Sequence, residues 1–319
     1  MKKIIAMLLA LMMVFALCAC GGGDDGAAKT EELMFGTGGE AGTYYAFGTV
    51  LAQQTSDETD TTVTAIVSKG SKANVEDVDA GAIQLGFVQS DVMSYAYTGT
   101  NLFDAAVNSF SVVGALYMEQ VQIVTMDPSI KTVADLKGKS VSIGASGSGV
   151  NFNAMDALKA YDLTLDDIDA QYLDFADSAE GLKDGKIDAA FIVAGAPTTA
   201  ITDLATGGKV YLVGFDAEHI SKLIEMCPYY KESVIKADVY GTPEDVTTVA
   251  VAAVVIAGND VSEDAVYNFL TATFNDLEDL TAAHAKGAEL SVEFAASVTD
   301  VPYHPGAVKF FAEHDIDVA

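Results

Sequence analysis

Residues 35–45, Phe-Gly-Thr-Gly-Gly-Glu-Ala-Gly-Thr-Tyr-Tyr, form the stretch that decides the fold. A short apolar run with strand character, residues 32–35, leads into the glycines, and a helical pattern follows at 43–54. Strand, glycine-rich turn and helix in this order indicate one unit of a parallel α/β sheet. Ligands of such sheets lie beyond the carboxyl ends of the strands, where glycines let backbone N–H groups approach them.

A second turn of the same kind lies in the middle of the chain. Gly144-Ala-Ser-Gly-Ser-Gly149 follows a strand-like run at 140–143 and precedes a helical pattern at 150–161. Each turn would direct the N-terminus of a helix at a ligand. One such turn is weak evidence, because both could serve only as tight turns. Two of them, one from each half of the protein, predict a two-sided clamp for an anionic group.

The rest of the chain continues the alternation of strands and helices. Strand patterns occur at 61–67, 83–88, 189–193, 209–214 and 246–256, and helical patterns at 74–81, 132–136, 178–184, 217–226, 262–276, 278–285 and 306–313. The run 246–256 is apolar throughout and predicts a strand buried on both faces. We expect a two-lobed α/β fold with a ligand cleft between the lobes. Lobe I comprises residues 32–126 and 244–319, and lobe II comprises residues 127–243.

The N-terminal residues 1–19 predict a lipoprotein signal peptide. Two lysines precede an apolar run that is short for a membrane span. The Leu-Cys-Ala-Cys sequence that ends at Cys20 resembles a bacterial lipobox, so we expect cleavage before Cys20 and lipidation of that residue. Glycine and aspartate dominate the following segment, which predicts a flexible tether at 20–31. An ordinary secretory signal cut nearby is the alternative.

The charge of the chain excludes some classes of partner. It contains 46 acidic residues against 17 basic ones, all of them lysine, and its net charge is −29. Such a surface repels phosphate backbones, so we expect no nucleic-acid binding. It also disfavours docking on anionic lipid, and we expect the lipid anchor to be the only contact with the membrane.

Residues typical of catalysis are sparse. The four histidines are scattered without the spacing of metal ligands, and there is no Gly-x-Ser-x-Gly motif. After signal cleavage and lipidation Cys227 is the only thiol, which leaves no intramolecular disulfide and predicts a packed residue. We therefore expect neither a metal site nor a cofactor. An enzyme on the same fold, such as a transferase or dehydratase, is the rival class, alongside a surface adhesin or structural lipoprotein.

A nucleotide site is the competing interpretation of the glycine-rich turns. The glycines at 144, 147 and 149 are spaced by 3 and 2, the reverse of the dinucleotide fingerprint. The turn at 36–42 is closer, but Ala41 occupies its sixth position. Neither turn is followed by Gly-Lys-Ser/Thr, which excludes a P-loop.

Several motifs occur in order along almost the whole chain. They are residues 35–45, Ser68-Lys-Gly-Ser-Lys-Ala-Asn74, Gln84-Leu-Gly-Phe-Val-Gln-Ser-Asp91, residues 133–149, residues 184–197 and His304-Pro-Gly-Ala307. In these motifs the chain resembles the TAXI family of TRAP-transporter solute receptors. The resemblance implies a two-lobed periplasmic-binding-protein type II fold and delivery of the ligand to TRAP-type membrane permease subunits. It also implies a ligand such as glutamate, glutamine or a 2-oxoglutarate-like carboxylate.

Residues that follow strands or begin helices are the candidates for ligand contact. One of Tyr44 and Tyr45 should face the cleft, and Gln89 suits an amine or a carboxylate. Asp91 could bind a ligand ammonium or only cap the following helix. The candidate ligand-binding residues are Thr37, Gly38, Gly39, Thr43, Tyr44, Tyr45, Gln89, Asp91, Ser146, Ser148, Asn151, Pro197 and Thr198, with Asn153 in the first turn of the second helix as a further candidate.

The absence of arginine restricts how an acidic ligand could be bound. Lysine cannot reproduce the bidentate pairing of arginine with a carboxylate, so helix N-termini, N–H groups, hydroxyls or a lysine must meet the charge. Lys69 and Lys72 lie near a candidate loop. We expect a monomeric, extracytoplasmic, lipid-anchored receptor, with an ABC-type substrate-binding lipoprotein as the alternative to the TRAP type.

Overall fold

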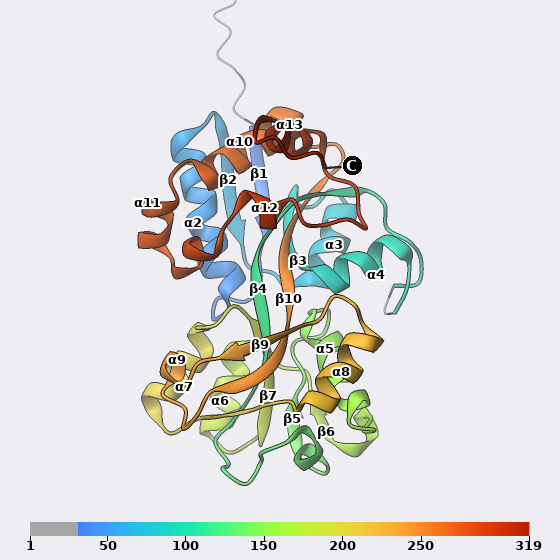
Figure 1. Cartoon of the computed structure of the whole chain (residues 1–319), viewed down its shortest axis with the longest axis vertical. Helices are drawn as coiled ribbons and strands as arrows, with labels where there is room; N and C mark the ends of the chain where they lie inside the picture. The colour runs from blue at the N-terminus through green and yellow to red at the C-terminus, as the bar shows by residue number, and fades with distance from the viewer. Residues whose placement is uncertain (1–30, 102, 319) are drawn as a thin grey trace, which may run out of the picture. The chain divides into compact units, whose positions relative to one another are not determined.

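The computed structural model describes residues 31–101 and 103–318 (Figure 1). The expected signal peptide, the lipidation site Cys20 and nearly all of the tether lie outside these residues. Within the described ranges, no helix is both long and apolar enough to cross a membrane.

The strands form one mixed sheet in the order β2-β1-β3-β10-β4-β7-β5-β6, with β8 paired to β4 and β9 paired to β10. The strands are β1 (Glu31–Gly36), β2 (Thr61–Ile66), β3 (Leu85–Gln89), β4 (Phe110–Thr125), β5 (Ser140–Ser142), β6 (Asp169–Gln171), β7 (Ala189–Ala194), β8 (Tyr211–Val213), β9 (Lys231–Ile235) and β10 (Val246–Gly258). The pairs β1–β2, β1–β3, β5–β6 and β5–β7 are parallel, as the glycine-rich turns predict.

Helices cover the sheet between its strands. They are α2 (Thr43–Glu58), α3 (Ser71–Asp79), α4 (Ser90–Thr98), α5 (Val150–Ala160), α6 (Phe175–Lys183), α7 (Thr199–Gly207), α8 (Ala217–Met226), α9 (Ala237–Tyr240), α10 (Glu263–Asn275), α11 (Leu277–Ala283), α12 (Val292–Ala295) and α13 (Pro305–Glu313). Three short 3₁₀ helices complete the set: η1 (Val133–Leu136), η2 (Leu165–Asp167) and η3 (Ala285–Glu289).

Two long antiparallel strands, β4 and β10, run through both halves of the structure (Figure 1). Residues 110–117 of β4 and 253–257 of β10 pack into a large core with β1, β3, α2 and α10. The opposite ends of the same two strands pack into two further hydrophobic clusters built from residues 121–251. We call the part around the large core the first lobe and the part around the other clusters the second lobe.

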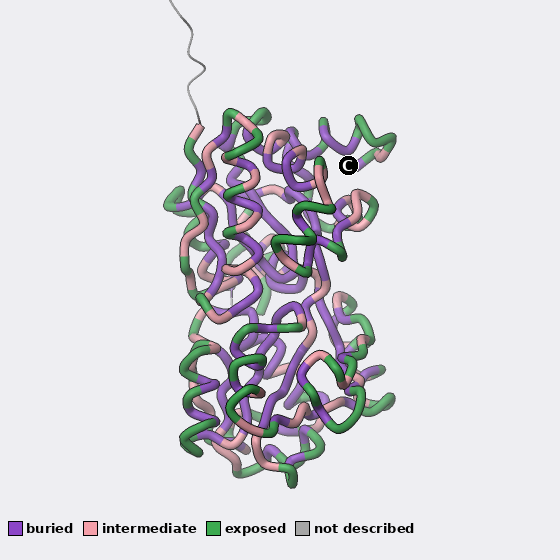
Figure 2. The backbone as a smooth tube through the Cα atoms, turned by 90° about the vertical axis from the view of Figure 1, so that its left-hand side faces the viewer, coloured by how far each residue is buried: buried purple, intermediate pink, exposed green. Residues whose placement is uncertain are grey.

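Burial follows the same division (Figure 2). Buried backbone runs through the middle of both lobes, and exposed backbone lies mainly on the outer helices and loops. The β10 strand is buried along almost its whole length, in agreement with its uninterrupted apolar sequence. The exact lobe boundaries at 126/127 and 243/244 stay a prediction.

Most of the expected elements form within a few residues of their predicted limits, but β4 is longer than the sequence indicates. Its first part, residues 110–118, is mostly apolar, and so is the part from Val121. The three polar residues Glu119, Gln120 and Gln122 interrupt the apolar run, although Glu119 and Gln122 are buried. The helix α7 and the strand β9 also escape the sequence analysis.

Asn74 fixes the first glycine-rich turn to the sheet. This side chain is fully buried in α3, and its Nδ2 atom lies 2.8 Å from the carbonyl oxygen of Thr37 and 2.7 Å from that of Phe87. It also donates to the Gly36 carbonyl at 3.2 Å. One amide group therefore holds the carboxyl ends of β1 and β3 together.

Replacing this amide should destabilise the protein. We expect Asn74→Ala to lower the free energy of unfolding by about 1–3 kcal/mol, because buried carbonyl groups lose their donor. Asn275→Ala, at an exposed asparagine at the end of α10, is the control and should change stability by less than about 0.5 kcal/mol. Urea denaturation of both variants measures the difference. Equal stability of the two would contradict the role given to Asn74.

Candidate functional site

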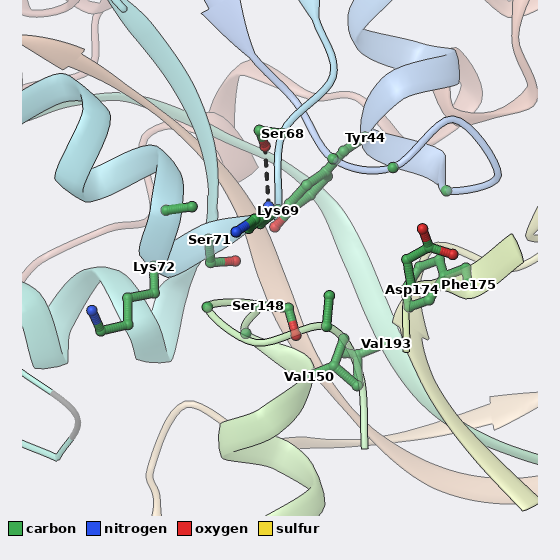
Figure 3. Close-up of a pocket in the computed structure, with 18 of the residues that line it drawn as sticks. Tyr44, Ser68, Lys69, Ser71, Lys72, Ser148, Val150, Asp174, Phe175 and Val193 are labelled. Atoms are coloured by element: carbon green, nitrogen blue, oxygen red, sulfur yellow. Dashed lines mark hydrogen bonds between the residues drawn. The ribbon is translucent and has the colours of Figure 1, made fainter. Parts of the chain in front are cut away.

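A cavity of about 1220 Å³ lies where the two lobes meet. The first lobe contributes residues of the turn after β1, of the start of α3, of the end of β3 and of the middle of β4. The second lobe contributes the turn after β5, the start of α6 and the end of β7. Figure 3 shows the Tyr44 ring reaching toward Ser71 and Lys69, with Ser148 and Val150 opposite and Asp174 and Phe175 to one side.

Three helices begin at this cavity without a side-chain cap. The residues before α2, α3 and α5 are Gly42, Gly70 and Gly149, and none of these helices has a side-chain hydrogen bond at its N-cap. A fourth helix at the cavity, α6, is capped by Asp174, and elsewhere α8, α10 and α11 are capped whereas α7 and α9 are not. Uncapped N–H groups at a helix start carry partial positive charge and favour an anion.

The two lobes touch each other directly around the cavity. The Ala73 N–H of α3 donates to the Gly147 carbonyl of the second glycine-rich turn at 3.2 Å. On the other side, the Thr43 hydroxyl donates to the Gly195 carbonyl at 2.8 Å. The glycines are needed for this approach, because a Cβ atom at Gly149 would lie 1.6 Å from Gln89 Oε1.

A buried polar network also joins the lobes. The Gln89 Nε2 amide donates to Asn153 Oδ1 at 2.9 Å, and Asn153 Nδ2 donates to Asp91 Oδ2 at 2.9 Å and to the Tyr230 hydroxyl at 2.8 Å. Tyr230 in turn donates to Asp156 at 3.1 Å. Gln89 and Asp91 belong to the first lobe, whereas the other members belong to the second. Polar chains of this kind fix the orientation of each amide in them.

Four buried polar atoms that belong to cavity-lining residues have no hydrogen-bond partner within the described part of the chain. They are the Tyr44 hydroxyl, Gln89 Oε1, Glu119 Oε1 and Ser148 Oγ. Leaving a buried polar atom unpaired costs about 1–3 kcal/mol. Their concentration around one cavity indicates that a bound molecule supplies the partners.

Glu119 is the most unusual charged group of the site. Its side chain is only 1% exposed, and burial raises the pKa of its carboxyl group to about 8. The neighbouring side chains of Tyr44 and Gln89 act in the opposite direction, and so does the charge of Lys286. Burial and the proximity of Glu119 raise the pKa of the Tyr44 hydroxyl well above its ordinary value.

Eight of the residues expected at the site line the cavity. They are Gly38, Gly39, Thr43, Tyr44, Gln89, Ser146, Ser148 and Asn151. Asn151 also supports the second turn, because its amide donates to the carbonyl groups of Ile143 and Gly144. Lys69 and Lys72 line the cavity as well, and Lys72 forms an ion pair with Glu76.

The other six expected residues lie outside the cavity lining. Thr37 is buried and donates its hydroxyl hydrogen to the Ile66 carbonyl at 2.6 Å, and Asp91 and Asn153 are buried in the inter-lobe network. Thr198 is buried, and its hydroxyl oxygen accepts a hydrogen bond from the Gln122 side-chain amide at 2.9 Å. Tyr45 follows Tyr44 on α2, so the two rings diverge by about 100° around the helix. Pro197 is exposed next to Thr198.

Sequence reasoning missed several residues that line the cavity. Glu119 stands out in the sequence only as a carboxylate inside an otherwise apolar strand. Ser71 begins α3, and Asp174 and Phe175 begin α6, so both positions follow the same rule of helix starts at the carboxyl edge of the sheet. Within the residues that the structure describes, no cluster of side chains could hold a metal ion, and the thiol of Cys227 is buried.

The Asp91 carboxyl group should make the stability of the protein depend on pH. Burial raises its pKa from 3.8 to about 7, so the folded protein keeps a proton that the unfolded chain releases near pH 4. Between these values the free energy of unfolding falls as pH rises. We expect the melting temperature of Asp91→Asn to gain on that of the original protein from pH 4 to pH 7. Parallel profiles, or an equal gain by the exposed-site control Asp203→Asn, would contradict this assignment.

Comparisons with known proteins agree with this architecture. The chain is similar to the alkanesulfonate-binding protein SsuA from Xanthomonas axonopodis pv. citri bound to MOPS, at 16% identity, a TM-score of 0.50 and coverage of 91% and 93% of the two chains. It is similar to PhnD1 from Prochlorococcus marinus in complex with methylphosphonate, at 11% identity, a TM-score of 0.54 and coverage of 82% and 91%. A putative L-cystine ABC transporter from Listeria monocytogenes matches at 16% identity, a TM-score of 0.51 and coverage of 82% and 98%.

These likenesses concern the fold, which is the expected two-lobed α/β fold of type II periplasmic binding proteins. The family model described as the NMT1-like family matches residues 35–314, which contain both glycine-rich turns and both crossing strands. The chain therefore belongs to the NMT1-like family.

Proposed function

We propose that this protein is an extracytoplasmic receptor that captures a small polar solute between its lobes and delivers it to a membrane transporter. The observation that carries the proposal is the set of four unpaired buried atoms around one inter-lobe cavity. In a purely structural interface, buried polar atoms normally have hydrogen-bond partners. A solute that pairs with them recovers free energy that the protein alone forgoes.

Binding would use opposite lobes for one molecule. The uncapped starts of α2 and α3 approach from the first lobe, and the uncapped start of α5 approaches from the second. An acidic group of the solute would accept hydrogen bonds from these N–H groups and from Ser148. Because β4 and β10 alone carry the sheet from one lobe to the other, small changes in their backbone would open and close the cleft.

Binding fits the residues of this cavity better than catalysis does. The lining includes no cysteine or histidine, and Ser148 has no neighbouring base among its described hydrogen bonds. Several of the solved structures similar to this chain, such as the alkanesulfonate-binding protein and the binding protein component of an ABC phosphonate transporter, carry names of binding proteins, which supports a receptor. Carboxyl groups such as those of Glu119 and Asp174 do line the cavity, but within the described residues none of them is hydrogen-bonded to a lining serine as the base of a nucleophile would be.

Two kinds of transporter are candidates for the partner. The names of the similar solved structures, an ABC phosphonate transporter component among them, favour delivery to an ABC-type permease. The ordered motifs from Phe35 to Ala307 favour delivery to a TRAP-type permease through their likeness to TAXI receptors. We place the ABC type first. In either case the expected signal and the lipid on Cys20 would hold the protein at the outer face of the membrane.

The proposal predicts a ligand-dependent gain in stability. Residues 31–319 form one compact unit, so the chain from Gly21 onward contains every described contact. After unfolding and refolding to remove carried-over solute, its melting temperature is measured with small carboxylates, amino acids, sulfonates, phosphonates and sugars. A solute at about 100 times its dissociation constant should add roughly 2.7 kcal/mol. No shift with any of these classes would contradict the receptor function.

Inter-lobe contact at Gly149 supplies a second prediction. A methyl group at this position would displace Gln89 and hold the lobes apart, so Gly149→Ala should weaken solute binding at least about tenfold. Gly207→Ala in α7 is the matched control, because its Cβ would meet only Lys183 at 3.4 Å, and its affinity should be unchanged. Calorimetric titration of both variants with a solute identified by the stability screen measures the effect. Equal affinities would show that closure around Gly149 is unnecessary.

A further inference from the structure

We propose that the buried floor of the cleft, formed by Glu119, Gln89 and Tyr44, binds a protonated amine of the solute. This inference rests on the proposed receptor function and adds a requirement to it. The solute must carry a cationic nitrogen as well as the acidic group that suits the glycine-capped helix starts. Glu119 would then be the residue that selects amine-bearing solutes over plain carboxylates, sulfonates and phosphonates.

Glu119 is a buried residue of the cavity wall and not a surface charge. It lies on the crossing strand β4, lines the cavity and is almost completely buried. Its Oε1 atom has no partner within the described residues, and no described ion pair includes Glu119. A buried carboxylate is costly unless a cation or strong donors meet it.

None of the nearby lysines of the described chain forms an ion pair with Glu119. Lys286 is buried behind the site, but its Nζ atom pairs with Glu289 and lies 5.5 Å from the centre of the Tyr117 ring. Lys72 pairs with Glu76 at the rim. Lys69 also lines the cavity and forms no ion pair within the described residues, but it forms none with Glu119 either. The carboxyl group of Glu119 therefore has no described ion-pair partner, and a cation of the solute could supply one.

The orientation of Gln89 follows from the network behind it. Asp91 accepts the hydrogen bond from Asn153 Nδ2, so Asn153 presents its oxygen to Gln89 Nε2. Gln89 must therefore turn its own oxygen, Oε1, away from the network, and this atom is buried and unpaired. This oxygen lies against Gly149 of the second lobe, where an added Cβ would be 1.6 Å away, and the Gln89 amide acts as a donor toward Glu119, which lowers the pKa of that carboxyl group.

Tyr44 completes the subsite from the first helix. Its ring stacks on Phe87 with the centroids 4.6 Å apart, which fixes the hydroxyl group in the cavity. The Glu119 carboxyl group and the neighbouring Tyr44 hydroxyl group thus lie together at the floor, and neither Glu119 Oε1 nor the hydroxyl oxygen has a close hydrogen-bond partner in the described chain. An alkylammonium group carries a positive charge and three N–H donors, which suit a carboxylate and a hydroxyl oxygen.

The opposite polarity of the rim supports a zwitterion. The glycine-capped starts of α2, α3 and α5 offer N–H groups at the mouth of the cavity, whereas the floor offers acceptors. A solute with an acidic group at one end and an amine at the other satisfies both. A plain dianion would place negative charge against Glu119.

Matched pairs of solutes that differ by one amine test the inference. The pairs are glutamate with glutarate, taurine with ethanesulfonate, and 2-aminoethylphosphonate with ethylphosphonate. We expect the amine-bearing member of at least one pair to bind at least about tenfold more tightly than its partner in calorimetric titration. Glu119→Gln should remove most of this preference, and the matched control Glu225→Gln, at an exposed position of α8 outside the cavity lining, should keep it.

The pH dependence of binding gives a test that needs no variant. An amine requires ionised Glu119, so its affinity should rise between pH 6 and pH 8 and then level off, because the pKa of the free carboxyl group is about 8. The charged and titratable groups that face Glu119 are Tyr44 from α2, Asp91 from α4, Tyr117 from β4 and Lys286 from η3. Glu119→Gln should abolish the slope if Glu119 is its source.

The possible outcomes separate the two proposals. Tighter binding of the plain acids, with an affinity that falls as pH rises, would show that neutral Glu119 donates to an acid and would overturn the amine subsite while leaving the receptor intact. An unchanged preference in Glu119→Gln would do the same. Absence of binding by every member of the pairs and of the wider solute panel would overturn both proposals.

Discussion

The antiparallel pairing of β4 with β10 is the constraint on which the rest of the structure depends. These two strands contribute to the cores of both lobes, so each lobe is anchored to the same pair of backbones. The register shifts at Ala253/Val254 and Val255/Ile256 bend the pair within the first lobe. Because β4 contributes to the cores of both lobes, it also crosses the cavity between them, and a side chain at that point can contact a solute.

Glu119 shows what this constraint costs and what it makes possible. A buried carboxylate in the middle of a strand weakens the core, but a rigid strand holds the group more precisely than a loop would. The three glycine N-caps follow the same logic, because each helix gives up a side-chain cap and keeps free N–H groups at the cavity. These positions lower the stability of the unbound protein, and a bound molecule would raise it again.

The sequence is sufficient to predict the glycine-rich turns, because their glycines stand between a strand pattern and a helix pattern. It also predicts that Tyr44, Gln89 and Ser148 lie at the cleft, since each follows a strand or begins a helix. It does not predict Glu119, whose place depends on which strand crosses the lobes. It singles out Asn153 as a ligand contact, but the hydrogen bonds of this residue to Gln89, Asp91 and Tyr230 appear only in the folded contacts. Thr37 and Thr198 illustrate the same limit: their hydroxyl groups bond to neighbouring backbone or side chains, and only the folded contacts reveal this.

Small-angle X-ray scattering of the refolded chain, with and without a solute that raises its melting temperature, tests the central claim most directly. The described structure has its lobes in contact through Ala73 and Gly147, through Thr43 and Gly195, and through the Gln89–Asn153 pair. The account predicts a smaller radius of gyration with the solute, approaching the value calculated from this structure. The same radius of gyration in both samples would contradict closure about the β4–β10 pair.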